Sequence, residues 1–143
     1  MSFFKNTKSK VLGSLILVLG LALIIGFQLY NKPHVNINKA GADLAIRADE
    51  LAEEYQMDEA KANQKYVDRI LEVEGRITKV TFDNGNSIVT LGGEDGKPGI
   101  ICQMLPEDNL KVLKYKERSS VKIKGICTGH LIDVMMIRCV FVD

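Results

Sequence analysis

The side chains in this sequence with the greatest potential for chemistry are three cysteines, Cys102, Cys127 and Cys139, and the histidine His130. Thiolates and imidazoles are the ligands that structural zinc sites use. Such sites usually separate two of their cysteines by about two to four residues. No pair of cysteines in this chain has that spacing, so the sequence argues against a zinc site.

A thiol nucleophile with His130 as its general base is the second chemistry that these residue types allow. A cysteine within an apolar strand is expected to be a buried and inert thiol. A lone histidine in a hairpin loop, such as His130, is expected to be solvated, and His34 in a polar segment has the same interpretation. We therefore expect no catalytic residue and no metal.

The glycine-rich segment Gly92 to Pro98 (GGEDGKP) is the next candidate, because glycine loops can hold phosphates. It lacks the Lys-Ser/Thr pair and the following helix of a P-loop, so it is interpreted as a turn. Paired catalytic carboxylates and a Ser-His-Asp arrangement are also missing from the sequence. The chain is expected not to be an enzyme and to need no cofactor.

A group of cationic side chains lies between residues 111 and 124. Its members are Lys111, Lys114, Lys116, Arg118, Lys122 and Lys124. A basic patch of this kind attracts the phosphates of nucleic acids. However, residues 66–143 carry 11 cations and 11 anions, and three of the anions lie within or beside the group. The sequence therefore favours a solvated face, and we expect nucleic acid not to be the ligand.

The net charge of +1 hides an uneven distribution of charge along the chain. Residues 1–32 contain 4 cations and no anion, whereas residues 33–143 contain 15 cations and 18 anions. Among the first residues, Val11 to Leu29 forms a run of 19 without a charge. A helix of that length spans about 28 Å, close to the ~30 Å hydrocarbon core of a bilayer. We expect a basic N-terminus at residues 1–10 and a transmembrane signal anchor at residues 11–30, which contacts the lipid bilayer through Val11 to Leu29.

The flanking lysines predict the orientation of this span. Lys5, Lys8 and Lys10 precede it and only Lys32 follows, which places the N-terminus in the cytoplasm by the positive-inside rule. The run exceeds the apolar region of a cleaved signal, and no A-x-A-like site follows it. We expect an uncleaved, single-pass protein of the bacterial inner (cytoplasmic) membrane with a periplasmic or extracellular C-terminal domain.

Two segments connect the span to the rest of the chain. Residues 31–41 are polar and are expected to form a linker. Residues 42–66 are expected to form a helical neck, because apolar side chains recur at helical spacing. These side chains are Leu44, Ala48, Leu51, Tyr55, Ala62 and Tyr66. Asp58 is expected to cap a second short helix that runs to Lys65.

Residues 67–143 change to a period of two, which is typical of β-strands. Strands are expected at 70–82, 87–91, 99–105, 120–127 and 131–142, with a short helix opening at Pro106. The first strand changes parity after Ile77, which predicts a bulge, and Gly75 is expected to mark its strongest curvature. Asn84 and Gly85 predict a tight hairpin turn.

This order describes a mainly β fold with helices, a five-stranded Greek-key barrel known as the OB-fold, with a helix between strands three and four. Residues 42–142 resemble the tRNA-anticodon-like (tRNA_anti-like) OB-fold family of bacterial envelope and lipoprotein-type proteins. The matching segments are ADELAEEYQMDEAKANQKY, ILEVEGRI, GIIC and VKIKGICTGHLIDVMMIRCVFV. The resemblance implies the fold, whereas the family name implies no demonstrated activity.

The cysteines gain a further interpretation in this fold. The last strand of the barrel pairs with strands three and four, so Cys139 neighbours both Cys102 and Cys127. An exported domain would allow one disulfide. The resemblance implies Cys102 with Cys139, because cysteines recur on the third and last strands of the family. A bridge from Cys127 to Cys139 and three buried free thiols remain alternatives.

The sequence thus predicts a membrane-anchored, non-catalytic binding or scaffold module of the cell envelope, with a protein or an oligosaccharide as its partner. Binding is expected on strands one to three and their loops, where OB-folds bind ligands. The loop residues concerned are Asn84, Gly85, Gly92, Gly93 and Lys97. The alternative is a protein that binds single-stranded nucleic acid, which OB-folds do through a positive groove and aromatic platforms. The second and third strands, SIVTL and GIICQML, contain no aromatic residue.

Overall fold

The computed structural model describes residues 3–31 and 35–143 and contains two compact units, one within residues 1–35 and one at Asn36–Asp143. Residues 1–2 of the expected basic N-terminus and residues 32–34 of the expected linker, including His34, lie outside the described residues.

The first unit contains one helix, α1 (Phe3–Tyr30), which includes all of the expected span Val11 to Leu29. Its segment Thr7–Tyr30 has 24 residues, and an 18-residue window within it has a mean hydropathy of 2.4 with none of the window buried. At about 1.5 Å per residue it is about 36 Å long, enough to cross a bilayer. A signal sequence has a similar composition, so α1 fits either a membrane span or a signal sequence.

The second unit is a closed β-barrel, which confirms the predicted OB-fold. Its strands are β2 (Ile70–Asp83), β3 (Asn86–Gly92), β4 (Gly99–Met104), β5 (Ser120–His130) and β6 (Val134–Val142). They are hydrogen-bonded in the order β2-β3-β4-β6-β5, and β5 closes the barrel by pairing with β2. The β4–β6 pair is parallel, and the other pairs within the barrel are antiparallel.

The long strand β2 serves two neighbours because it bends. Its first half, Ile70 to Arg76, pairs with β5, and its second half, from Ile77, pairs with β3. The register shifts between Ile77 and Lys79, which confirms the bulge predicted from the change of parity. The predicted hairpin is also confirmed, since Asn84 and Gly85 both adopt positive φ between β2 and β3.

A sixth strand, β1 (Leu44–Arg47), lies parallel to the first half of β2, where a helix was predicted. Leu44 and Ile46 are half-buried whereas Ala45 and Arg47 are exposed, which is the period of a strand. Within residues 35–143, β1 is the strand that pairs with this edge of β2, over Leu71 to Glu74. The expected helix therefore begins at Ala48 instead of at residue 42.

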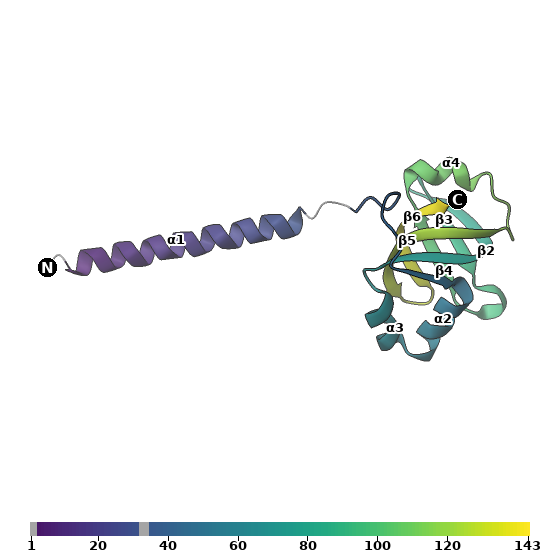
Figure 1. Cartoon of the computed structure of the whole chain (residues 1–143), viewed down its shortest axis with the longest axis horizontal. Helices are drawn as coiled ribbons and strands as arrows, with labels where there is room; N and C mark the ends of the chain where they lie inside the picture. The colour runs from purple at the N-terminus through teal and green to yellow at the C-terminus, as the bar shows by residue number, and fades with distance from the viewer. Residues whose placement is uncertain (1–2, 32–34) are drawn as a thin grey trace. The chain divides into compact units, whose positions relative to one another are not determined.

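Two helices follow, α2 (Ala48–Met57) and α3 (Glu59–Tyr66), and they lie at one end of the barrel (Figure 1). The predicted stripe faces the core, since Leu51, Tyr55, Ala62 and Tyr66 are all buried. The carboxylate of Asp58 accepts a hydrogen bond from the Lys61 N–H at 3.1 Å, which confirms the predicted cap.

The expected helix between the third and fourth barrel strands is only a short turn. It consists of the 3₁₀ segment η2 (Pro106–Asp108) and α4 (Asn109–Val112), at the opposite end from α2 and α3 (Figure 1). Val112 is buried against the barrel. The buried carboxylate of Asp108 accepts a hydrogen bond from the Phe141 N–H at 2.8 Å and so ties this turn to β6.

Residues 36–41, the second half of the expected linker, belong to the barrel unit. The side chain of Ile37 is buried, and the Lys124 ammonium donates a hydrogen bond to the Ala40 carbonyl at 2.7 Å. Asn38 donates a hydrogen bond from its side-chain amide to the Glu107 carboxylate at 3.3 Å. The chain therefore joins the barrel beside η2 and α4.

Candidate functional site

The candidate ligand face is the outer surface of β3 and β4 together with the neighbouring part of β2. Its central side chains pair across the strands, Thr81 with Ile88 and Thr90 with Ile101, while Ile88 also lies opposite Gln103. They alternate with buried residues that face the core, and they are themselves half-buried or exposed. The face thus presents isoleucine side chains beside hydroxyl and amide groups, and its central residues carry no charge.

Phe82 is an exposed aromatic residue at the end of β2 that sequence reasoning did not assign to a site. Its side chain is 60% exposed. However, Phe82 lies opposite Ser87, whose side chain is buried toward the core, so it has the inward parity rather than that of the ligand face. Phe82 therefore does not add an aromatic side chain to the ligand face. Strands β3 and β4 contain no aromatic residue either, so the face has no platform on them for stacking a base.

The five predicted loop residues do not form one site, because the structure places them at opposite ends of β3. Asn84 and Gly85 lie at the β2–β3 turn, where the Asn109 side chain donates a hydrogen bond to the Gly85 carbonyl at 2.7 Å. Gly92, Gly93 and Lys97 lie at the β3–β4 connection. The seven residues of β3 separate the two groups.

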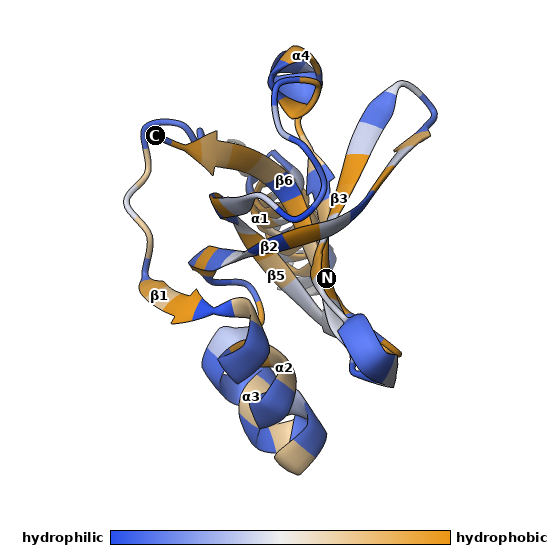
Figure 2. Ribbon diagram, turned by 90° about the vertical axis from the view of Figure 1, so that its right-hand side faces the viewer, coloured by the Kyte–Doolittle hydropathy of each residue, from blue (hydrophilic) through white to orange (hydrophobic). Residues whose placement is uncertain are grey.

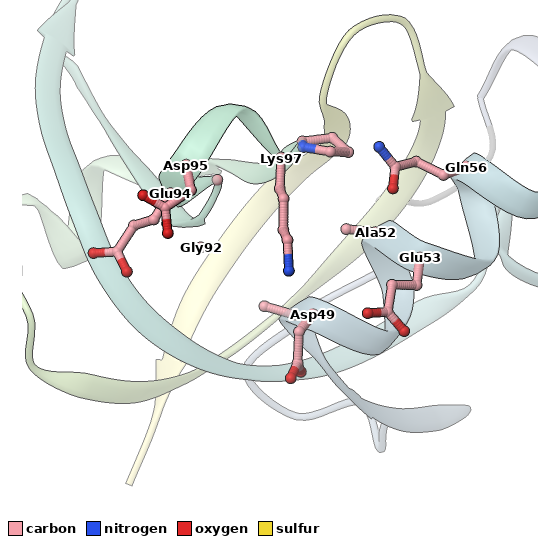
Figure 3. Close-up of a pocket in the computed structure, with 11 residues that line it drawn as sticks. Asp49, Ala52, Glu53, Gln56, Gly92, Glu94, Asp95 and Lys97 are labelled. Atoms are coloured by element: carbon pink, nitrogen blue, oxygen red, sulfur yellow. The ribbon is translucent and has the colours of Figure 1, made fainter.

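A small cavity of about 220 Å³ lies between this second loop and α2. Figure 3 shows Lys97 extending from its loop toward α2. The polar residues that line the cavity are Asp49, Glu53, Gln56, Glu94, Asp95 and Lys97. Sequence reasoning missed the α2 residues because the helix faces a loop about 40 positions later in the chain, a proximity that only the tertiary fold creates.

The charges around this cavity are mostly negative, since four carboxylates surround one ammonium group. The Arg47 guanidinium bonds to Asp49 at 3.2 Å and lowers the pKa of that carboxyl below its usual range. Asp49 is therefore ionised at neutral pH. Such a lining repels phosphate groups and favours a ligand with cationic or hydroxyl groups.

The six residues of the predicted basic patch are divided among several partners. Lys111 forms an ion pair with Asp108 at 3.0 Å, and Lys124 bonds to the Ala40 carbonyl. Lys122 lies opposite Glu74 across the β2–β5 pair, in the same way that Lys124 lies opposite Glu72. Among the described residues, Lys114, Lys116, Arg118 and Lys122 of this set make no side-chain hydrogen bond or ion pair, and all four are exposed.

The three cysteines are free thiols in the structure, and all three are fully buried in the core. The structure therefore does not show the disulfide that the sequence left open, and it agrees with the alternative of three buried free thiols. Burial raises the pKa of the Cys139 thiol well above its ordinary value, and the neighbouring Cys102 thiol raises it further. Buried thiols of this kind are expected to be inert.

His130 lies at the end of β5, and the expectation that it is solvated is wrong. Its ring stacks on that of Tyr55 from α2, with a centroid distance of 5.4 Å. Both ring nitrogens are buried and have no hydrogen-bond partner. Tyr55 lies 75 positions earlier in the chain, so this contact depends on how α2 packs. No group of three or more His, Cys, Asp or Glu within the described residues is arranged to hold a metal ion.

Comparison with known proteins identifies the family. The tRNA_anti-like family matches residues 1–141 of the chain. The chain belongs to the tRNA_anti-like family. This confirms the resemblance that the strand motifs indicated, and it covers the apolar helix as well as the barrel. No curated protein matches the sequence.

Several solved structures are similar to this tRNA_anti-like protein. One is a proposed nucleic acid-binding lipoprotein from Klebsiella pneumoniae, at 15% identity and a TM-score of 0.59, with 68% of this chain and 91% of that chain covered. A second is the S. pombe Stn1–Ten1 complex, at 13% identity and a TM-score of 0.40, with 51% of this chain and 57% of that chain covered. A third is asparaginyl-tRNA synthetase from Pyrococcus horikoshii, at 13% identity and a TM-score of 0.40, with 55% of this chain and 20% of that chain covered.

Proposed function

We propose that this protein is a membrane-anchored, non-catalytic binding module of the bacterial cell envelope, which recognises a protein through the outer face of β3 and β4. The observation that carries the proposal is the composition of that face. Ile88 and Ile101 lie on it beside Thr90 and Gln103, without an aromatic residue on either strand. The uncharged centre of this face fits the core of a protein–protein interface, where charged residues are depleted. Oligosaccharide is the less favoured ligand.

The proposed anchor is α1. Its 24-residue segment Thr7–Tyr30 has the length and mean hydropathy of a membrane span. The lysines before it support a cytoplasmic N-terminus and a barrel on the outer side of the inner membrane. The similar structure from Klebsiella pneumoniae is described as a lipoprotein, and membrane attachment of a barrel of this fold agrees with that description.

The proposal of a non-catalytic role is supported by the state of the reactive groups. The thiols of Cys102, Cys127 and Cys139 are buried, where they cannot meet a substrate. The imidazole of His130 is stacked on Tyr55 and reaches no thiol or hydroxyl as a base, since its ring nitrogens have no partner. The face on β3 and β4 contains no titratable group at its centre.

Binding of single-stranded nucleic acid is the second candidate function. The fold and the description of the similar lipoprotein as nucleic acid-binding favour it, together with the exposed cations Lys114, Lys116 and Arg118. Against it stand the missing aromatic platforms on β3 and β4 and the acidic lining of the cavity beside Lys97.

Site-specific photocrosslinking separates these functions. A photoreactive amino acid replaces Ile101 on the ligand face, and as a matched control it replaces the exposed Lys61 of α3, in the full chain expressed in bacterial membranes. We expect a discrete protein adduct from position 101 and none from position 61. In parallel, the purified full chain in lipid nanodiscs is titrated with fluorescent oligothymidine. Oligothymidine binding that weakens steeply with salt, without an adduct at position 101, would reject the protein-binding proposal in favour of nucleic acid.

A further inference from the structure

An exposed apolar surface surrounds α4, at the end of the barrel opposite α2 and α3. We define this α4 surface by its apolar residues Phe82, Leu110 and Leu113 and its cationic residues Lys114, Lys116 and Arg118. The exposed fractions of the apolar side chains are 60% for Phe82, 76% for Leu110 and 69% for Leu113. Figure 2 shows the hydrophobic and hydrophilic residues of α4 side by side on one turn of helix.

The fold directs the side chains of Leu110 and Leu113 away from the core. Val112 is the α4 residue that packs against the barrel, so Leu110 and Leu113, three positions apart, lie together on the other side of the turn. The Asn109 amide oxygen accepts hydrogen bonds from the Ser87 N–H at 2.9 Å and from the Ser87 hydroxyl at 2.8 Å. Because Ser87 lies opposite Phe82, this contact brings α4 to the end of β2 that carries Phe82.

We propose that the α4 surface docks onto the bilayer that holds α1, with its leucines at the level of the lipid headgroups and its lysines on anionic phosphates. This proposal rests on the membrane anchoring proposed above. Exposed leucine and phenylalanine side chains beside lysine and arginine are the composition of segments that bind the membrane interface. The α4 surface shares with such segments an apolar patch, which can enter the boundary between headgroups and acyl chains, and cations at the edge of that patch.

The position at which the chain joins the barrel supports this occupant over another protein. Asn38 bonds to Glu107, which lies only three positions before Leu110. Residues 31–35 connect Tyr30, the last residue of α1, to Asn36, the first residue of the barrel unit. Even fully extended, this connection spans about 20 Å, at about 3.3 to 3.6 Å per residue. The connection to α1 therefore enters the barrel unit at its α4 end.

The tether also removes the need for a strong interaction. A short connection gives an effective concentration of roughly millimolar for the second contact. Anions limit the electrostatic attraction, since Glu107 and Glu117 belong to the same segment and Asp108 neutralises Lys111. Each lysine at an anionic surface contributes about a fivefold gain in binding. Lys114 and Lys116 together therefore suffice for a tethered contact.

The opposite end of the barrel provides a matched control. Leu131 and Ile132 lie in the β5–β6 turn and are also strongly exposed, at 86% and 83%. The Asp133 side chain in that turn accepts a hydrogen bond from the Gly99 N–H, so the turn lies at the start of β4. Because α4 follows the end of β4, the turn and α4 lie at opposite ends of this strand. The acidic cavity residues Asp49 and Glu53 lie at that end, so an anionic membrane would repel it.

The chain contains no tryptophan, so a single introduced tryptophan reports its own surroundings. The full-length variants Leu113→Trp and Leu131→Trp are each reconstituted into vesicles of phosphatidylcholine and phosphatidylglycerol, with and without bromine on the acyl chains. We expect brominated lipid to quench Leu113→Trp and to leave Leu131→Trp bright. Adding Lys114→Glu and Lys116→Glu to the Leu113→Trp chain should weaken quenching, and pure phosphatidylcholine should do the same.

Equal quenching at both positions, or none at position 113, would overturn the docking proposal. Flotation of the vesicles tests the anchor separately. If the chain does not float with the vesicles, the anchoring fails and the docking fails with it, whereas flotation without quenching rejects docking alone. A shift of the Leu113→Trp emission on addition of oligothymidine, with no response to brominated lipid, would assign the surface to nucleic acid and reject the membrane. Both variants replace exposed residues, and equal melting temperatures confirm that they fold.

Discussion

Gly75 of β2 lies directly beneath Ala48, the first residue of α2. A Cβ atom added to Gly75 would lie 2.7 Å from the Cβ of Ala48 and 3.2 Å from that of Leu91. Real Cβ atoms do not approach so closely, so either β2 or α2 must move when position 75 carries a side chain. The glycine thus permits α2 to pack closely on the bent strand. This is a second role for Gly75, besides the strand curvature that the sequence predicted at this residue.

The first prediction concerns this contact. Gly75→Ala should lower the free energy of unfolding by about 1 to 3 kcal/mol, because overpacking forces the backbone apart. Adding Ala48→Gly should restore part of the loss by removing the opposing Cβ. Chemical denaturation of the full chain in detergent measures both, with Gly41→Ala as a control at a position with open space around it. A double variant no more stable than Gly75→Ala would mean that the contact with Leu91 limits the packing.

The strands of this fold could be predicted because their signals are local. The parity change after Ile77 and the Asn84-Gly85 pair each act within a few residues, and both have the predicted structure. Strand β1 was missed because Leu44 and Ala48 also fit a helical stripe, and only the unpaired edge of β2 decides between helix and strand. Local patterns contain no information about that edge.

The candidate site was less predictable for the same reason. Sequence reasoning grouped Lys111 to Lys124 by their proximity in the chain, yet the structure pairs Lys111 with Asp108 and Lys124 with the Ala40 carbonyl. It interpreted His130 by its loop, although Tyr55 covers the ring. The short helix expected from Pro106 is a turn in which Val112 is buried, whereas Leu110 and Leu113 are exposed.

The second prediction follows from the unpaired nitrogens of His130. A buried polar group without a partner costs about 1 to 3 kcal/mol, and phenylalanine retains the stack on Tyr55 without that group. His130→Phe should therefore leave stability unchanged or raise it by up to about 2 kcal/mol. His130→Ala, which removes the stack as well, should lower stability. A loss of stability in the phenylalanine variant would show that the imidazole has a hydrogen-bond partner, such as bound water.

The third prediction concerns stability at low pH and the carboxylate of Glu54. The Tyr66 hydroxyl donates a hydrogen bond to it at 2.7 Å, and the Lys65 ammonium lies 3.0 Å from it. The Tyr66 bond first, and Lys65 second, lower the pKa of Glu54 below its usual value. A lowered pKa contributes stability above the unfolded-state pKa, and this contribution is lost as the pH falls through the folded-state pKa.

Glu54→Gln removes this contribution and keeps the size of the side chain. Thermal unfolding of both proteins should therefore show a wild-type advantage at neutral pH that decreases as the pH falls below the ordinary pKa of glutamate. Glu59→Gln is a suitable control on the adjoining helix, since Glu59 is exposed and its side chain makes no hydrogen bond or ion pair in the described structure. A constant difference at all pH values would mean that Glu54 acts by packing instead of by charge.

The fourth prediction concerns the thiols. Cys102, Cys127 and Cys139 are fully buried, so a thiol reagent should find no reactive cysteine in the folded chain and three in denaturant without reductant. Counting thiols by absorbance under both conditions makes the comparison. One thiol in denaturant, with two more after reduction, would instead reveal a disulfide formed in the cell.

The fifth prediction uses these unreactive thiols to test the proposed orientation. Because the native cysteines are buried, an introduced surface cysteine is the only site that a maleimide should label. Lys61→Cys on the exposed side of α3 should react with a membrane-impermeant maleimide in intact spheroplasts, since the lysines before α1 direct the barrel outward. Lys8→Cys, near the start of α1, should react only after lysis. The reverse pattern would place the barrel in the cytoplasm, where the nucleic-acid alternative gains support.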